Sequence, residues 1–166
     1  MNAMNSFTMK CLTELGYDYI MPSPELTGVQ LASIAEHSAL ADRMLIGIHG
    51  RTPLMQLLHC PIKEHKGCQN CMGIAGAVTD EAGRVFPLVN IRYPDNCLVR
   101  MLNCRTTDLI DLFDRIPQTA GYVLNFVGEQ IDEVTERIAA ANEAKNGKRQ
   151  TQYPNSTRGH WMRKVE

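Results

Sequence analysis

The chain has 166 residues, of which 44% are hydrophobic and 21% are charged, and its formal net charge is −1. This composition is typical of a globular protein with its own core and excludes a disordered chain, while the near-neutral charge excludes a general attraction to nucleic acid or membranes. The sequence contains neither an apolar run long enough to span a bilayer nor the apolar stretch of a signal peptide at its start. We therefore expect a cytoplasmic protein whose cysteines are reduced.

The first part of the chain alternates helical and strand patterns. Apolar residues recur at helical spacing over residues 6–15, and Gly16 is typical of a helix end. YDYIMP (17–22) predicts a short buried strand, and RMLIGIHG (43–50) predicts a second one. Between them SPEL, which starts at Ser23, predicts the beginning of a helix, because Ser favours the cap and Pro the first helical position.

The middle of the chain loses the helical period. AGAVTDEAGRVFPLV (75–89) predicts a β-hairpin with its turn at Asp80–Gly83, and CLVRML (97–102) predicts a further strand. This region contains few large apolar residues. A structural metal would supply the folding energy that so small a core lacks.

The last third returns to the alternating pattern. TDLIDLFDRI (107–116) predicts a helix, GYVLNFV (121–127) predicts a strand, and residues 129–144 predict a final helix. The final helix has an apolar face that we expect to be buried, formed by Ile131, Val134, Ile138 and Ala141.

Alternating strands and helices predict parallel strands joined by helical crossovers. Because a complete eightfold βα barrel takes about 250 residues, we expect an α/β fold with a partial barrel-like parallel sheet, or a small open sheet, and an inserted cysteine-bearing antiparallel subdomain. The predicted organisation is βα units over 1–58, the insertion over 59–104, a closing αβα unit over 105–145 and a basic carboxyl-terminal arm over 146–166.

Cysteines are concentrated in HCPIKEHKGCQNC (59–71), and a further one follows the predicted hairpin. The Cys-x-x-C pair can place two sulfurs on one ion, and the hairpin can return the chain to the same point. We therefore predict a metal site formed by Cys60, Cys68, Cys71 and Cys97. Four thiolates suit a structural Zn²⁺ and equally a 4Fe–4S cluster.

Other interpretations of these cysteines stay open. A redox dithiol or ordinary reduced thiols would explain the same residues without a metal. Reserve ligands are His59, His65 and Cys104.

Polar residues follow each predicted parallel strand, where α/β proteins place their active sites. Glu25 and His49 are candidate acids or bases, and Arg51 is a candidate carboxylate or phosphate binder. Ser23, Asn125 and Glu129 occupy similar positions. Each also has a structural interpretation, such as helix capping, a buried structural histidine or a surface ion pair.

Several longer motifs resemble those of the collagenase-like peptidases, peptidase family U-thirty-two. These motifs are NAMNSFTMKCLTELGYDYIMPSPEL, IHGRTPLMQLLHCP, TDEAGRVFPL and STRGHWMRKVE, and together they extend over nearly the whole chain in the family's order. The resemblance implies a βα barrel followed by smaller elements, of which this chain matches the later part. It also implies a peptidase, although some members of the family carry an iron–sulfur cluster and assist hydroxylation of RNA bases or of a quinone precursor. Because the cluster cysteines of those members belong largely to another segment, the resemblance favours Zn²⁺ here, with a 4Fe–4S cluster as the alternative.

Part of a barrel would leave an unpaired strand edge, so we expect a homo-oligomer or a missing amino-terminal barrel half as the partner. The basic arm, with Tyr153 and Trp161, either binds RNA or folds back onto the protein. Two functions follow as alternatives: a proteolytic enzyme, or an accessory module for RNA modification.

Overall fold

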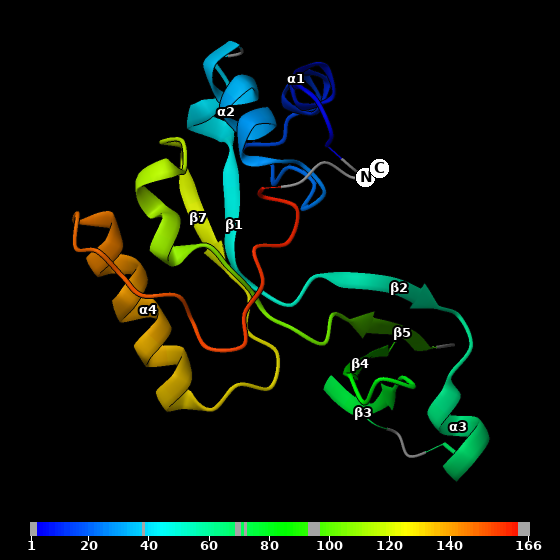
Figure 1. Cartoon of the computed structure of the whole chain (residues 1–166). Coiled ribbons are helices and arrows are strands. Elements are labelled where there is room, and N and C mark those ends of the chain that lie inside the picture. The colour runs from blue at the N-terminus through cyan, green and yellow to red at the C-terminus, as the bar shows by residue number, and fades with distance from the viewer. Residues whose placement is uncertain (1–2, 38, 69–70, 72, 93–96, 163–166) are drawn as a thin grey trace.

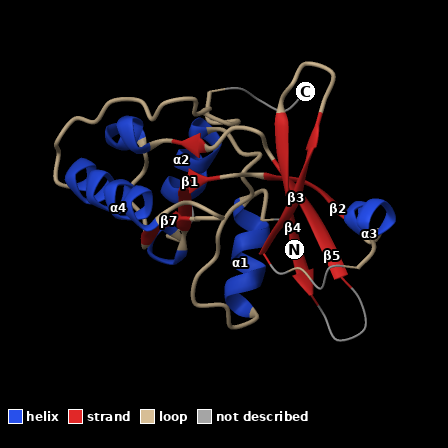
Figure 2. Ribbon diagram, turned by 90° about the horizontal axis from the view of Figure 1, so that it is seen from below, coloured by secondary structure: helices blue, strands red, loops and turns tan. Residues whose placement is uncertain are grey.

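The computed structural model describes residues 3–37, 39–68, 71, 73–92 and 97–162. They form a mixed α/β structure with two sheets, which Figures 1 and 2 show as two neighbouring lobes. The α/β lobe contains α1 (Ser6–Glu14), α2 (Gly28–His37), β1 (Leu45–Gly50), β6 (Thr107–Asp108), β7 (Gly121–Leu124), α4 (Ile131–Lys145) and the 3₁₀ segments Ala41–Arg43 and Ile110–Arg115. The antiparallel lobe contains β2 (Pro53–Leu57), α3 (Pro61–Lys66), β3 (Gly73–Thr79), β4 (Val85–Arg92) and β5 (Cys97–Leu102).

The sheet of the α/β lobe has the order β6-β1-β7. β1 pairs with β7 in parallel and with β6 in antiparallel orientation, and it is preceded by a parallel bridge between Ile20 and Met44. The predicted parallel pairing near residues 43–48 and 122–126 is therefore confirmed, whereas the predicted strand at 17–22 is reduced to one bridge. No closed barrel is formed by the described residues.

Local side-chain hydrogen bonds decide where the first helices begin. The Asn5 side chain accepts a hydrogen bond of 2.8 Å from the backbone N–H of Thr8, which caps α1. The predicted helix start at Ser23 is wrong. Thr27 instead caps α2, because its hydroxyl accepts from the Gln30 N–H at 3.2 Å while Gln30 Oε1 accepts from the Thr27 N–H at 2.9 Å, a reciprocal capping box.

The antiparallel lobe confirms the predicted hairpin and the strand at 97–102, in the order β2-β5-β4-β3. Asp80 organises the hairpin turn by accepting from the backbone N–H groups of Ala82 and Arg84 at 3.0 and 2.9 Å. The backbone N–H of Arg84, together with its guanidinium, holds the pKa of Asp80 below its usual value. The sheet also includes β2 (Pro53–Leu57). The antiparallel lobe therefore begins before residue 59, where we expected the insertion to start.

Two expectations for the closing unit are wrong. Residues 107–116 form no α-helix: β6 pairs with the end of β1, the Leu109 N–H donates to the Ile48 carbonyl at 2.8 Å, and a 3₁₀ segment follows. The apolar face of α4 is turned outward, with Ile131 75% and Ile138 46% exposed, and of the four expected residues only Ala141 is buried. The helix instead buries Arg137, whose contacts are described below.

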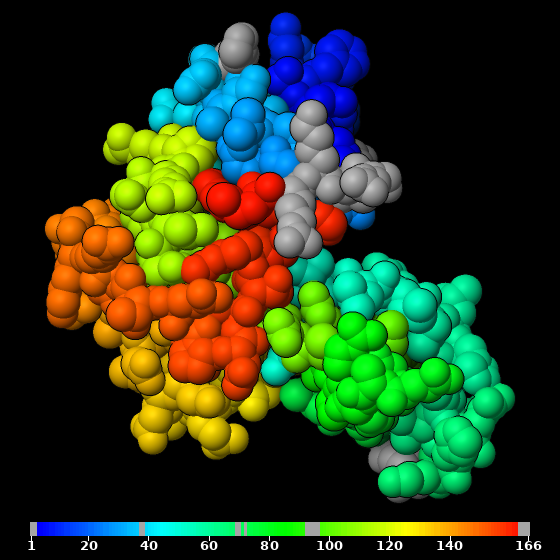
Figure 3. All heavy atoms as spheres, viewed as in Figure 1, coloured from blue at the N-terminus to red at the C-terminus, as the bar shows by residue number. Residues whose placement is uncertain are grey.

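The carboxyl-terminal arm docks onto the α/β lobe, as one of the two interpretations of it predicts (Figure 3). Trp161 is buried against Gly28, whose N–H donates to the Trp161 carbonyl at 3.0 Å. A β-carbon at Gly28 would lie 2.6 Å from the indole, so only glycine permits this contact. Within the described part of the chain, no helix combines the length and the apolar character that a membrane span requires.

Candidate functional site

A buried histidine lies at the carboxyl end of β1. The β1–β7 register shifts between Gly47 and His49, so that the consecutive residues Ile48 and His49 are both buried. A bulge of this kind redirects a side chain from one face of a strand to the other. The chain thereby turns the His49 ring inward, where His49 Nδ1 lies 2.7 Å from Asp108 Oδ2.

The partner of His49 is fixed by the sheet. Asp108 is the residue opposite His49 in the β1–β6 register, and its side chain is fully buried. Its other carboxylate oxygen accepts a hydrogen bond of 3.3 Å from the Ile110 N–H. An ionised carboxylate can only accept a hydrogen bond, so Nδ1 carries the proton when Asp108 is ionised. The lone pair of the neutral ring then lies on Nε2, the nitrogen that a general base uses.

Arg137 of α4 supplies a counter-charge for Asp108. Its side chain is 7% exposed, and its Nε lies 3.8 Å from Asp108 Oδ2. The guanidinium carbon lies 4.6 Å from the centre of the Tyr153 ring, in cation–π geometry. Arg137 Nε and Nη2 have no hydrogen-bond partner among the described residues, so charge rather than hydrogen bonding holds this pair.

Two aromatic rings complete the surroundings of His49. Phe126 and Tyr153 lie with ring centres 5.2 and 5.7 Å from it. Burial, and secondarily the charge of Glu133, raises the pKa of Tyr153, so its hydroxyl stays protonated at neutral pH. The site therefore combines a general-base candidate, a buried ion pair and a phenol donor.

A cavity of about 330 Å³ lies between the two lobes, and we call it the inter-lobe cavity. His49, Arg51 and Tyr153 line it, together with Cys104, Glu129 and Glu133. Arg51 Nη1 donates to the carbonyls of Asn103 and Cys104 at 2.9 and 2.7 Å, which fixes the guanidinium at the cavity wall. This arrangement can bind a polar or anionic group beside the imidazole.

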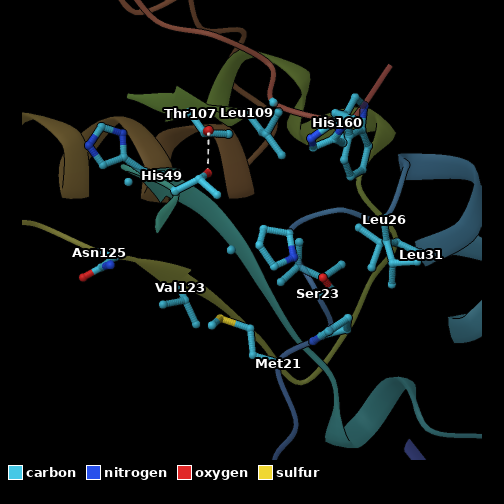
Figure 4. A pocket seen from close by; sticks show the side chains of 18 of the residues that line it. Met21, Ser23, Leu26, Leu31, His49, Thr107, Leu109, Val123, Asn125 and His160 are labelled. Carbon is cyan, nitrogen blue, oxygen red and sulfur yellow. Dashed lines mark hydrogen bonds between the residues drawn. The ribbon is translucent and has the colours of Figure 1, made fainter. Parts of the chain in front are cut away.

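A second cavity, of about 250 Å³, runs along β1 from Leu45 to Gly50 and reaches the carboxyl end of β7, and we call it the strand-end cavity (Figure 4). Four of the residues expected at strand ends line it: Ser23, His49, Arg51 and Asn125. Glu25 lines neither cavity and is exposed. Glu129 lines only the inter-lobe cavity, where its carboxylate accepts from the Val127 N–H. Of the three predicted catalytic residues, the fold thus brings together His49 and Arg51 and leaves Glu25 apart.

The predicted metal ligands share one end of the antiparallel sheet. The register places Leu57, Val99, Asn90 and Gly73 in one row across β2, β5, β4 and β3. Cys60 follows β2, Cys97 is the first residue of β5, and Cys71 lies two residues before β3, so all three are near the same end of the sheet. Cys68 comes three residues before Cys71. Cys71 accepts from Asn90 Nδ2 through its carbonyl at 3.0 Å and its sulfur at 3.4 Å.

The cysteines lie near one end of the sheet, but their side chains do not form a metal-binding group in the described residues. In the part of the chain that the structure describes, no three His, Cys, Asp or Glu side chains are grouped so as to hold a metal ion. The reserve ligands are also dispersed: the exposed His59 pairs with Glu64 at 3.0 Å, and Cys104 lines the inter-lobe cavity. The four-cysteine metal site therefore stays a prediction, and no chemical step is assigned to it.

The sequence did not indicate Asp108 or Arg137 as site residues, and it indicated Tyr153 only as an aromatic residue of the arm that could stack on RNA. Asp108 lies in a segment with a helical pattern, and Arg137 lies on a helix whose apolar residues indicated another inward face. The pairing of β6 with β1 brings Asp108 to His49, and the packing of α4 and of the arm adds Arg137 and Tyr153. Comparisons with known proteins add no homologue: no protein-family model matches the chain, and neither a curated protein nor a solved structure gives a significant match.

Proposed function

We propose that the chain is the carboxyl-terminal portion of a collagenase-like peptidase and that it hydrolyses peptide bonds by acid–base catalysis at His49. The observation that carries this proposal is the 2.7 Å contact between His49 Nδ1 and the buried Asp108, at a strand end where His49 lines two cavities. A buried carboxylate that orients an imidazole is a recurring device of hydrolases. The sequence motifs of the family supply the substrate class.

The proposed roles follow from what each side chain can donate or accept. His49 Nε2 takes the proton of the attacking water and returns it to the departing amine. Asp108 holds the ring in the tautomer that leaves Nε2 unprotonated. Arg51 stabilises the negative charge that develops on the carbonyl oxygen, because its guanidinium is already fixed by two backbone carbonyls.

The test is hydrolysis of a mixed fluorogenic peptide library by the purified chain. His49→Gln should lower kcat/KM by at least about a hundredfold, the lower end of the range for general-base catalysis. His59→Gln is the matched control, because that histidine is about 60% exposed and lies on the antiparallel lobe. Equal turnover by the chain and by His49→Gln would exclude the proposed mechanism.

A partner is part of the same proposal. β7 is an edge strand of its sheet in the described residues. Such an edge pairs readily with another strand. We propose that a second copy or an amino-terminal barrel half covers it and extends the partial barrel. Light scattering of the isolated chain, and peptide hydrolysis with and without the upstream half, test these two partners.

The gathering of cysteines supports a second candidate function, an RNA-modification module with a bound metal. The ligands would be Cys60, Cys68, Cys71 and Cys97. A bound Zn²⁺ would stabilise the antiparallel lobe, whose core is small, whereas a 4Fe–4S cluster would supply redox chemistry. Elemental analysis and an absorbance spectrum separate the two metals, and Cys68→Ser should release either one.

The arm is less available for RNA than its sequence indicates. Arg158 forms a bidentate ion pair with Asp111, at 2.5 and 2.6 Å, and Lys148 pairs with Glu143 at 2.8 Å. RNA binding that depends on Arg149, with no peptide hydrolysis, would nevertheless favour the module over the peptidase.

A further inference from the structure

We infer that the strand-end cavity is the specificity pocket of this site and binds an aliphatic or aromatic side chain of a peptide. This inference rests on the proposed peptidase function, and it names the substrate class. Its readout is ligand binding rather than turnover, so it can fail separately from the proposed activity.

The walls of the cavity are apolar. One side comes from the exposed face of the parallel sheet, and the opposite side comes from the segment before α2 and from the docked arm. The apolar lining includes Met21, Leu45 and Val123 on the first side and Leu26, Leu31 and Trp161 on the second. Met21 is 56% exposed at its position in this lining, so apolar surface is left for an occupant to cover.

The size of the cavity fits one side chain and not a whole ligand. Its volume is about 250 Å³. An apolar protein cavity of about 150 Å³ binds benzene, whereas pockets for complete drug-sized ligands start at about 300 Å³. An occupant of intermediate size, such as a leucine, methionine or phenylalanine side chain, fills this volume and displaces water from its walls.

The polar residues at the cavity are placed for a peptide backbone. Figure 4 shows His49 and Asn125 at one end of the cavity and Leu26 and Leu31 at the other. The Asn125 N–H donates to the His49 carbonyl at 2.8 Å, which ties this wall to the proposed base. His49 and Arg51 line both cavities, so the strand-end cavity adjoins the proposed catalytic site.

Trp161 makes the inference directly measurable. It is the sole tryptophan of the chain, and it lines this cavity. N-acetyl-leucinamide and N-acetyl-phenylalaninamide should produce a saturable change in tryptophan emission. N-acetyl-glutaminamide, which is of similar size to the leucine probe but polar, should bind at least tenfold more weakly.

Gly47→Val is the variant that fills the pocket. A β-carbon at Gly47 would meet only Met21 Sδ, at 4.0 Å, so the strand accepts the side chain and the cavity loses volume. We expect the affinity for both apolar probes to fall at least tenfold. Ala77→Val, which adds a branched side chain at an exposed position of β3, should leave it unchanged. If Gly47→Val does not fold, Met21→Ala removes part of the wall at a half-exposed position and should weaken binding of the leucine probe about threefold or more.

The outcomes distinguish the two proposals. Saturable apolar binding that Gly47→Val abolishes supports the pocket, even if no peptide is hydrolysed and the peptidase proposal fails. Absence of a saturable response, or an equal response in Gly47→Val, overturns the pocket, even if hydrolysis is observed. Equal binding of the glutamine and leucine probes also overturns it, because the walls would then not select apolar side chains.

Discussion

Replacing Asp108 by asparagine removes a buried charge while preserving the shape of the side chain. Asp108 is fully buried, and Arg137, 7% exposed, has its Nε 3.8 Å from the carboxylate. Coulomb's law with an effective dielectric constant of about 20 gives an attraction of about 4 kcal/mol for unit charges at this separation. Mutations that leave one partner of a buried ion pair uncompensated typically cost about 3–5 kcal/mol. We therefore expect Asp108→Asn to lower the free energy of unfolding by about 4 kcal/mol.

Urea unfolding at pH 7 measures this change. In a chain of this size about 1 kcal/mol corresponds to about 2–4 °C in Tm, so thermal unfolding should shift downward by about 8–16 °C. Asp114→Asn is the matched control, because Asp114 is exposed in the neighbouring 3₁₀ segment and should change stability by less than about 0.5 kcal/mol.

A double-mutant cycle tests the reason for the loss. Arg137→Met removes the buried cation, so the combination Asp108→Asn with Arg137→Met should be considerably more stable than the sum of the two single losses predicts. A loss below about 1 kcal/mol in Asp108→Asn, or strict additivity in the cycle, would refute the conclusion that the two charges compensate each other inside the protein.

Two further predictions concern the arm and the hairpin. Trp161→Ala should lower the free energy of unfolding in urea by about 3–5 kcal/mol, because the buried indole packs on Gly28. Met162→Ala, at a neighbouring side chain that is 64% exposed, should lower it by less than about 0.5 kcal/mol. Equal losses in the two variants would contradict the docking of the arm through Trp161. The hydrogen bonds from Arg84 lower the pKa of Asp80 in the folded state. The ionised Asp80 therefore stabilises the folded protein above the ordinary aspartate pKa, and this stabilisation is lost as the pH falls through the pKa of Asp80 in the folded state. In Asp80→Asn the Tm should fall less steeply as the pH is lowered from about 5 to 2, as measured by thermal unfolding. An unchanged dependence of Tm on pH would argue against this stabilising role of Asp80.

Elements with strong local signals were predictable from the sequence. The β-hairpin carries its own turn chemistry, since Asp80 bonds to backbone groups only two and four residues away. β5 and α1 likewise follow from local apolar patterns and from Gly16, whose φ of +93° favours glycine. The start of α2 was predicted a few residues too early, because both Ser23 and Thr27 are residue types that cap helices. The reciprocal hydrogen bonds between Thr27 and Gln30 place the cap at Thr27.

The site was predictable only in part. His49 and Arg51 were identifiable because they follow a strand whose carboxyl end faces the ligand side of a parallel sheet. Asp108 was not, since its role depends on an antiparallel pairing with a residue 59 positions away. The helix α4 turns Arg137 toward Asp108 and leaves Ile131 and Ile138 exposed, an orientation that its apolar pattern did not predict.

The sequence by itself determined the α/β alternation, the hairpin and the candidate residues at the ends of the strands, because periodicity, capping and turn chemistry act over a few neighbouring residues. The tertiary structure alone decided which charges are buried together, which face of α4 points inward, and how the arm and the two lobes enclose cavities around His49. These features depend on contacts between segments that are distant in the sequence. Such tertiary contacts can override the local conformational preferences from which a sequence pattern is interpreted.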